Sequence, residues 1–220
     1  MRQDTDLNSL HGDKRWAALV QDLEKKVAAL EASYNKPLKA QLEKIYETDQ
    51  GVRRKIGPAQ EKYGNDSPEM QALWKEMIAV DEENRKAVIA IIEEHGWPGT
   101  SMVGPQASSA AFLVIQHIPQ EEKETMEKYL PLLREAAAKG EAEKSHLALM
   151  EDRVLMYNGQ PQLYGSQLRM NNNTGKYELY TIEDEANVDK RREEMGLEPL
   201  ADYMKRYGIE YKVPQAKSEN

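Results

Sequence analysis

The sequence of 220 residues contains no cysteine, so disulfide bonds, thiolate zinc sites and cysteine nucleophiles are excluded. Aromatic residues are scarce at 7%, with a single phenylalanine. No apolar run is longer than the six residues of Ala110–Ile115, which is too short for a membrane-spanning helix. An excess of positive charge is also missing, since the formal net charge is −8. An acidic chain does not attract phosphates, so nucleic-acid binding is not expected.

Motifs that would identify a reaction are absent as well. The chain has no glycine-rich phosphate-binding loop, and its histidines lack the paired spacing of zinc proteases. Ser166 is flanked by Gly165 and Gln167 in a predicted strand, so it does not form a nucleophile elbow. The sequence therefore predicts no metal site and no cofactor.

The N-terminal residues 1–13 contain neither a basic stretch nor an apolar one, so no signal peptide is predicted. The absence of cysteine agrees with the cytoplasm, but exported bacterial proteins without disulfides are also common. The expected compartment is the cytoplasm unless a signal peptide has been removed.

The first part of the chain has the apolar spacing of helices. Between residues 13 and 34, apolar residues recur at intervals of three or four: Trp16, Leu19, Leu23, Val27, Leu30 and Tyr34. Pro37 suits the first turn of a second helix, and Ser67-Pro68-Glu69 predicts the start of a third that ends at His95. We expect residues 1–95 to form an N-terminal helical segment, a helical hairpin plus a long helix, which could offer a groove to a protein partner.

Residues 96–212 are predicted to form a second helical domain. Ala107–Ile118 is apolar on all sides, which indicates a buried central helix, and Pro131 is expected to break a later one. Residues 162–170 and 176–182 are rich in β-forming residues and flank a turn-rich loop, which predicts a β-hairpin. The predicted fold is mainly α, a multi-helix domain with one small β-hairpin near the C-terminus, followed by a disordered tail at residues 213–220.

His117 is the main candidate for chemistry, because the end of the apolar helix carries it toward the core. A buried imidazole needs partners for both ring nitrogens. Histidine is also the side chain most suited to proton transfer near neutral pH. We predict His117 as a catalytic acid or base and Asp152, on the flank of a later helix, as the carboxylate that orients it.

Four further residues are predicted to bind a small polar ligand: Gln116, Arg153, Tyr164 and Gln167. In a regular strand Tyr164 and Gln167 would point to opposite faces, unless Gly165 forms a bulge between them. Whether both face the same site is therefore open.

Several stretches of the second domain, between about Trp97 and Tyr207, resemble an uncharacterised bacterial family known only as a domain of unknown function. The stretches are Gly96-Trp97-Pro98, Ala110–His117, Asp152-Arg153-Val154-Leu155, Tyr164-Gly165-Ser166-Gln167, Val188–Arg192 and Gly196–Leu200. Ser166 stands where that family more often has threonine, which keeps the hydroxyl. The resemblance implies a shared fold and no particular reaction.

Two functions are compatible with these features. The first is a hydrolase or small-molecule-binding domain with a polar pocket around His117, in which activated water would be the attacking group. The second is a non-catalytic helical interaction module in which a buried His117 is structural. Convergence of Gln116, His117, Tyr164 and Gln167 around an accessible hollow, within about 8 Å, would favour the first function.

Overall fold

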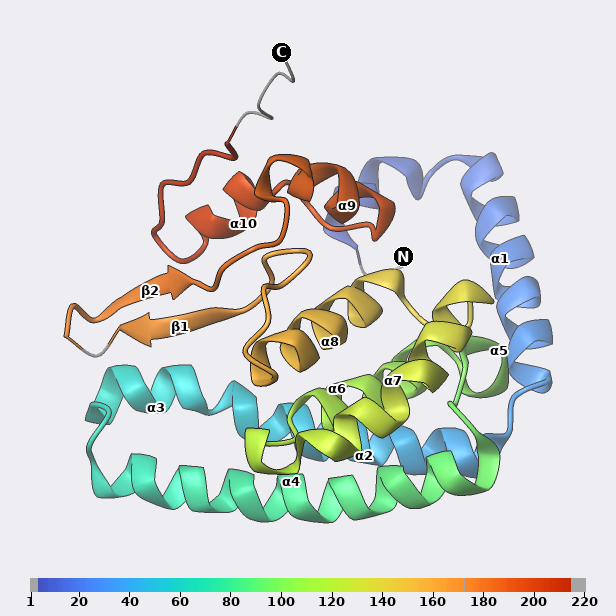
Figure 1. Ribbon diagram of the computed structural model, residues 1–220. Helices are drawn as coiled ribbons and strands as arrows, with labels where there is room; N and C mark the ends of the chain where they lie inside the picture. The colour runs from blue at the N-terminus through green and yellow to red at the C-terminus, as the bar shows by residue number, and fades with distance from the viewer. Residues whose placement is uncertain (1–3, 172, 215–220) are drawn as a thin grey trace.

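The computed structural model describes residues 4–171 and 173–214, and it confirms a mainly α fold with a small β-hairpin near the C-terminus (Figure 1). The first helices are η1 (Thr5–Leu10), α1 (Lys14–Ala32), α2 (Lys36–Arg54), α3 (Ile56–Tyr63) and α4 (Pro68–His95). The central ones are α5 (Thr100–Val103), α6 (Pro105–Gln116), η2 (Gln120–Glu122), α7 (Lys123–Ala138) and α8 (Lys144–Tyr157). The last elements are β1 (Leu168–Asn171), β2 (Lys176–Leu179), η3 (Glu185–Asn187), α9 (Val188–Glu194) and α10 (Leu200–Lys205). In this described part of the chain, no helix is long and apolar enough to cross a membrane.

The long helices begin where capping side chains predict. The Asn35 side chain accepts the Leu38 N–H at 3.2 Å before α2, and the Ser67 hydroxyl accepts the Met70 N–H at 3.2 Å before α4. Each cap satisfies an N–H group that has no partner within its own helix. A proline in the first turn of each helix adds to the same start signal.

The main core is formed by α2, α4, α7 and α8, which pack around α6. The inner residues of α6 include Ala110, Ala111 and Phe112. The small side chains of α6 let neighbouring helices approach closely. Leu42 of α2 and Ile91 of α4 belong to this same core. The core therefore continues across the boundary that the sequence suggested between residues 95 and 96.

Helix α7 continues through Pro131, so the prediction that this proline would break the helix is wrong. Proline removes one N–H donor and is usually costly inside a helix. The buried residues Met126, Tyr129, Leu130 and Leu133 lie on both sides of it. Their burial in one continuous face offsets the lost hydrogen bond.

The hairpin pairs β1 with β2 in antiparallel register, from Leu168 opposite Leu179 to Asn171 opposite Lys176. It is shorter than predicted, since residues 163–167 form a loop before β1. Gly165 has a φ of +69° in this loop, a conformation outside the strand region.

The hairpin continues into a C-terminal cluster of buried apolar residues: Ile182, Val188, Leu200 and Met204. Val213 packs against this cluster, although it falls in the tail predicted to be disordered. Residues 215–220 of that predicted tail lie outside the described residues.

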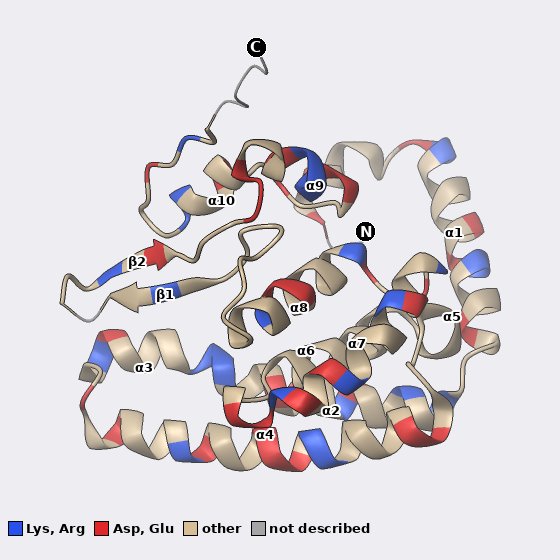
Figure 2. Ribbon diagram, viewed as in Figure 1, with Lys and Arg blue, Asp and Glu red and all other residues tan. Residues whose placement is uncertain are grey.

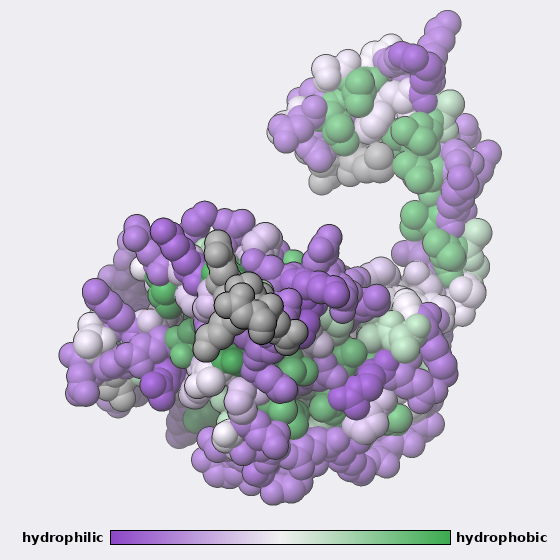
Figure 3. All heavy atoms as spheres, turned by 45° about the horizontal axis from the view of Figure 1, so that its top comes forward, coloured by the Kyte–Doolittle hydropathy of each residue, from purple (hydrophilic) through white to green (hydrophobic). Residues whose placement is uncertain are grey.

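Helix α1 differs from the other long helices because it stands off from the body with η1 as an arm (Figures 1 and 3). Val20 is the buried residue of α1. Its remaining apolar side chains are half-buried or exposed, so the helix adds little to the core.

Candidate functional site

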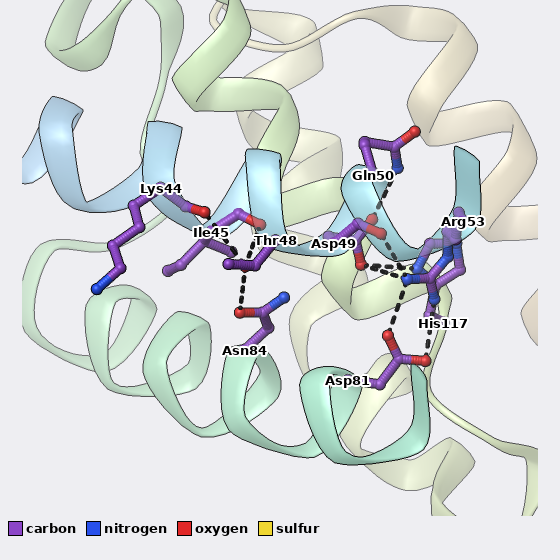
Figure 4. Close-up of polar contacts among 9 residues, drawn as sticks. All are labelled: Lys44, Ile45, Thr48, Asp49, Gln50, Arg53, Asp81, Asn84 and His117. Carbon is purple, nitrogen blue, oxygen red and sulfur yellow. Dashed lines mark hydrogen bonds and ion pairs between the residues drawn. The ribbon is translucent and has the colours of Figure 1, made fainter. Parts of the chain in front are cut away.

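His117 caps the C-terminus of α6, as its sequence position predicts, and its side chain is 22% exposed. The carboxylate beside it is Asp49 of α2, whose Oδ1 lies 3.2 Å from His117 Nδ1 (Figure 4). The Asp49 side chain is only 1% exposed. The packing of α2 against α6 thus brings the buried Asp49 carboxylate next to the His117 imidazole, although the two residues are 68 positions apart in the chain.

Asp49 has two further side-chain partners on its own helix. Gln50 Nε2 donates to Asp49 Oδ2 at 2.7 Å, and Arg53 Nη1 donates to Asp49 Oδ1 at 2.9 Å. Burial by itself would raise the pKa of Asp49, but the hydrogen bond from His117 and the charges of His117 and Arg53 outweigh it. The pKa of Asp49 is therefore lowered, and its carboxylate is ionised at neutral pH.

Arg53 also joins α2 to Asp81 of α4. Arg53 Nη2 donates to Asp81 Oδ2 at 2.9 Å, and Nη1 lies 2.9 Å from Asp81 Oδ1 as an ion pair without hydrogen-bond geometry. One guanidinium therefore connects the two carboxylates, and the site links three helices (Figure 4).

His117 and Asp49 line a hollow of about 240 Å³ between α2, α4, α6 and η2. Apolar side chains also line it: Ile78, Val114, Ile118 and Pro119. The charged lining residues are Asp81, Glu82, Arg85 and Glu122, of which Arg85 and Glu122 form an ion pair at 2.9 Å. Arg53 pairs with Asp49 and Asp81, and Lys86 pairs with Glu82 at 2.6 Å, so each carboxylate on the wall of the hollow already has a cationic partner within the chain.

A metal ion fits this arrangement poorly. Asp49, Asp81 and His117 offer ligand atoms within 4.8 Å of one another. Arg53, however, already brings a positive charge within 2.9 Å of both carboxylates. A divalent cation would have to displace the guanidinium, so we assign no metal to the site.

Asp152 does not take the role predicted for it, because its carboxylate binds the backbone of the loop before β1. Oδ1 accepts the N–H groups of Leu163 and Tyr164 at 2.7 and 3.0 Å, and Oδ2 accepts that of Ser166 at 2.9 Å. Asp152 is fully buried, and this burial raises its pKa against the effect of the three N–H donors. Its position corrects our prediction: Asp49, not Asp152, contacts His117.

Arg153 connects two other predicted residues without facing the hollow. Its Nη1 donates to the backbone oxygen of Gln116, and its Nε donates to Gln167 Oε1 at 3.0 Å. Gln167 is buried and donates through Nε2 to Ser166 Oγ at 2.9 Å. These groups satisfy one another, so they hold the loop on the helices and are not among the hollow's lining residues.

Tyr164 is buried and donates its hydroxyl proton to Glu151 Oε2 at 3.1 Å. Burial raises the pKa of Tyr164, so the hydroxyl stays protonated. Its backbone oxygen accepts from Arg192 Nη1 at 2.6 Å. Tyr164 and Gln167 therefore do not converge with His117 around the hollow, contrary to the expectation from sequence.

The sequence profile of a family of unknown function (DUF6624) matches residues 36–213. The chain belongs to this family. The match confirms the resemblance to a family of unknown function, and it extends to α2 and α4, beyond the stretch from Trp97 to Tyr207. No curated protein and no solved structure matches the chain.

The DUF6624 match includes His117 and its partner Asp49, and also Arg53 and Asp81, which are linked to Asp49, whereas α1 precedes it. Our sequence reasoning missed these three residues, although one signal was present. Asp49 falls on the apolar stripe that Leu42 and Ile45 begin on α2. An acidic residue on a buried stripe needs a charged partner, and Arg53 one turn later supplies one.

Proposed function

We propose that the protein binds a small polar molecule in the hollow beside His117 and transfers protons to or from it, with hydrolysis as the reaction class. The observation that carries this proposal is the contact between His117 Nδ1 and Asp49 Oδ1 on the wall of an open hollow.

The chemistry follows from the tautomer that Asp49 selects. A carboxylate that accepts Nδ1–H leaves Nε2 of the imidazole with a free lone pair. Among the described residues, Nε2 of His117 has no hydrogen-bond partner. In this proposal Nε2 accepts a proton from water as the water oxygen attacks the ligand, and the proton then passes to the leaving group. Asp49 stabilises the imidazolium formed in between.

The ligand class follows from size and charge. A volume of about 240 Å³ lies below the roughly 300–1,000 Å³ of sites for drug-sized molecules, so the ligand is small. The apolar wall at Val114 and Ile118 suits a short hydrocarbon portion, and Asp81, whose Oδ1 accepts no hydrogen bond among the described residues, suits an amine or hydroxyl group.

The test is a thermal-shift screen of amino acids, small amines and their esters and amides against three proteins: wild type, His117→Gln and the control His95→Gln. His95 lies at the C-terminus of α4 and is not among the residues that line the hollow. A ligand at 100 times its Kd stabilises by about 2.7 kcal/mol, or about 5–10 °C for a chain of this size. We expect hits that raise the Tm of wild type and His95→Gln but not of His117→Gln. NMR spectra of each hit with each protein would then reveal any turnover.

The same variants test the alternative, a structural His117 in a non-catalytic module. If His117→Gln lowers the free energy of unfolding by about 2 kcal/mol or more while ligand shifts persist, the imidazole serves the core and the proposal fails.

A further inference from the structure

The wall of the hollow beside His117 continues onto an apolar flank of α4. Ile78 lines the hollow and is nevertheless 64% exposed, and Trp74, one helical turn before it, is 39% exposed. Residues three or four positions apart share a face of a helix, so one flank of α4 carries Trp74, Ile78, Asp81 and Arg85. The hollow therefore opens onto two large apolar side chains that the described residues leave partly uncovered.

The charged side chains on the wall of the hollow are already paired within the chain. The ion pairs are Asp49–Arg53, Asp81–Arg53, Glu82–Lys86 and Glu122–Arg85. Figure 2 shows acidic and basic residues adjacent to each other on the middle of α4. A charged ligand would have to separate one of these pairs, which costs free energy at a partly buried position. An anion is disfavoured most, because two of the carboxylates share the single guanidinium of Arg53. The hollow therefore favours an uncharged ligand.

The polar end of such a ligand meets His117 and Asp81. His117 Nε2 offers a lone pair when Nδ1 carries the proton, and Asp81 Oδ1 accepts no hydrogen bond among the described residues. Both groups suit a ligand with N–H or O–H donors. Of the uncharged groups with such donors, a carboxamide also contains a bond that water can hydrolyse.

We propose that the hollow binds amides of aliphatic acids, with the hydrocarbon chain lying over Ile78 and reaching Trp74. From Ile78 to Trp74 is one helical turn, about 6 Å, which a chain of several methylenes spans. The inference rests on the proposed function, because it names the substrate of the same site. Water adds its oxygen to the amide carbon, the C–N bond breaks, and the nitrogen leaves with the proton held at His117 Nε2, so the products are a carboxylate and ammonium.

The first test measures the Kd of acetamide, butanamide, hexanamide and octanamide for the full chain by calorimetry or thermal shift. We expect the Kd to fall about two- to fourfold for each added methylene until the chain passes Trp74, because each methylene leaves water for an apolar surface. Hexanoate should bind about tenfold more weakly than hexanamide, since its charge meets carboxylates and no unpaired cation.

The second test locates the hydrocarbon chain with variants. Ile78→Ser should remove most of the gain in affinity from butanamide onward, and Ile78→Leu should keep it. Trp74→Ser should remove the gain only from hexanamide to octanamide. Met170→Ser, at a 44% exposed residue on β1, is the matched control and should keep the wild-type series. Circular dichroism checks that each variant is folded.

A Kd that does not depend on chain length, or a dependence that persists in both serine variants at α4, would overturn the inference. Release of ammonium from the same amides, compared between wild type and His117→Gln, tests the proposed function separately. Chain-length-dependent binding without His117-dependent ammonium release would overturn the hydrolysis and leave the aliphatic site. Ammonium release that depends on His117 but not on chain length would leave the proposed function and overturn the aliphatic site.

Discussion

Asp49 and Asp152 are both buried carboxylates on helices of one core, yet their partners differ in kind. Asp152 accepts three backbone N–H groups from a single loop. Asp49 accepts from the side chains of His117, Arg53 and Gln50, and its neighbour His117 opens onto a hollow. Their pKa values move in opposite directions, raised for Asp152 by burial and lowered for Asp49 by its charged partners.

The comparison distinguishes a structural carboxylate, Asp152, from Asp49, which is placed beside a group that can exchange protons. Backbone N–H groups do not exchange protons in acid–base chemistry, and their hydrogen bonds to Asp152 fix the loop that donates them. An imidazole can take up and release a proton, and the carboxylate beside it sets which nitrogen does so. Burial of an acidic residue alone therefore does not identify a site, whereas the identity of its partners does.

The largest effect that this contrast predicts is on stability, from Asp152→Ala. The substitution leaves three N–H groups without an acceptor, and each buried N–H group that lacks a partner costs about 1–3 kcal/mol of stability. We expect the free energy of unfolding, measured by urea denaturation, to fall by about 3–5 kcal/mol.

Asp152→Asn is the graded control for this prediction. An asparagine oxygen at the position of Oδ1 could still accept from Leu163 and Tyr164, so the loss should be about half as large. If Asp152→Ala costs less than about 1 kcal/mol, the loop does not depend on the carboxylate and the contrast with Asp49 disappears.

A smaller effect is expected from Gly165→Ala in the loop that Asp152 holds. A Cβ at this position would lie 2.7 Å from Ile182 Cδ1 and 2.9 Å from Leu200 Cδ1, and the φ of +69° disfavours any side chain. We predict a loss of about 2–3 kcal/mol in urea denaturation.

Gly175→Ala in the hairpin loop is the matched control for Gly165→Ala. Its φ is +65°, but a Cβ there would meet no atom within 4 Å, so only the backbone cost of about 1 kcal/mol remains. Equal losses in the two variants would show that the loop before β1 is not tightly packed.

Local signals in the sequence are sufficient to predict the long helices but not the loop at residues 163–167. Ser67-Pro68 and the apolar spacing that follows mark α4 to the residue, because caps and helical periodicity act within a few positions. Residues 163–167 have the composition of a strand, but the carboxylate of Asp152 engages their N–H groups, and Gly165 turns the chain. That competition is tertiary, so the sequence pattern does not show it.

The candidate site was predictable only in part for the same reason. His117 could be selected because a polar residue at the end of an apolar helix is conspicuous. Its carboxylate could not be chosen by proximity in sequence, since Asp49 lies on a helix that the sequence assigned to another domain. The pairing depends on how α2 packs along α6, which no local pattern encodes.

Asp49→Asn, with a smaller expected effect than Asp152→Ala, gives the most direct comparison of the two aspartates. Asp49→Asn removes the ion pair with Arg53 and the charge beside His117, and we expect a loss of about 1–2 kcal/mol at neutral pH. Because the pKa of Asp49 is lowered on folding, the stability it contributes is complete above the ordinary aspartate pKa of 3.8 and is lost as the pH falls through the folded-state pKa. The difference in the free energy of unfolding between wild type and Asp49→Asn should therefore become smaller as the pH falls below 3.8.

For Asp152 the sign is reversed. Its pKa is raised on folding, so the folded chain takes up the proton first as the pH falls toward 3.8 and gains stability relative to the unfolded chain. The difference in the free energy of unfolding between wild type and Asp152→Asn should then become larger as the pH falls toward 3.8. Urea denaturation of the three proteins from about pH 7 to about pH 3 measures both differences. Parallel curves would mean that the two carboxylates have equivalent surroundings, and the physical reason for placing the chemistry at Asp49 and His117 would be lost.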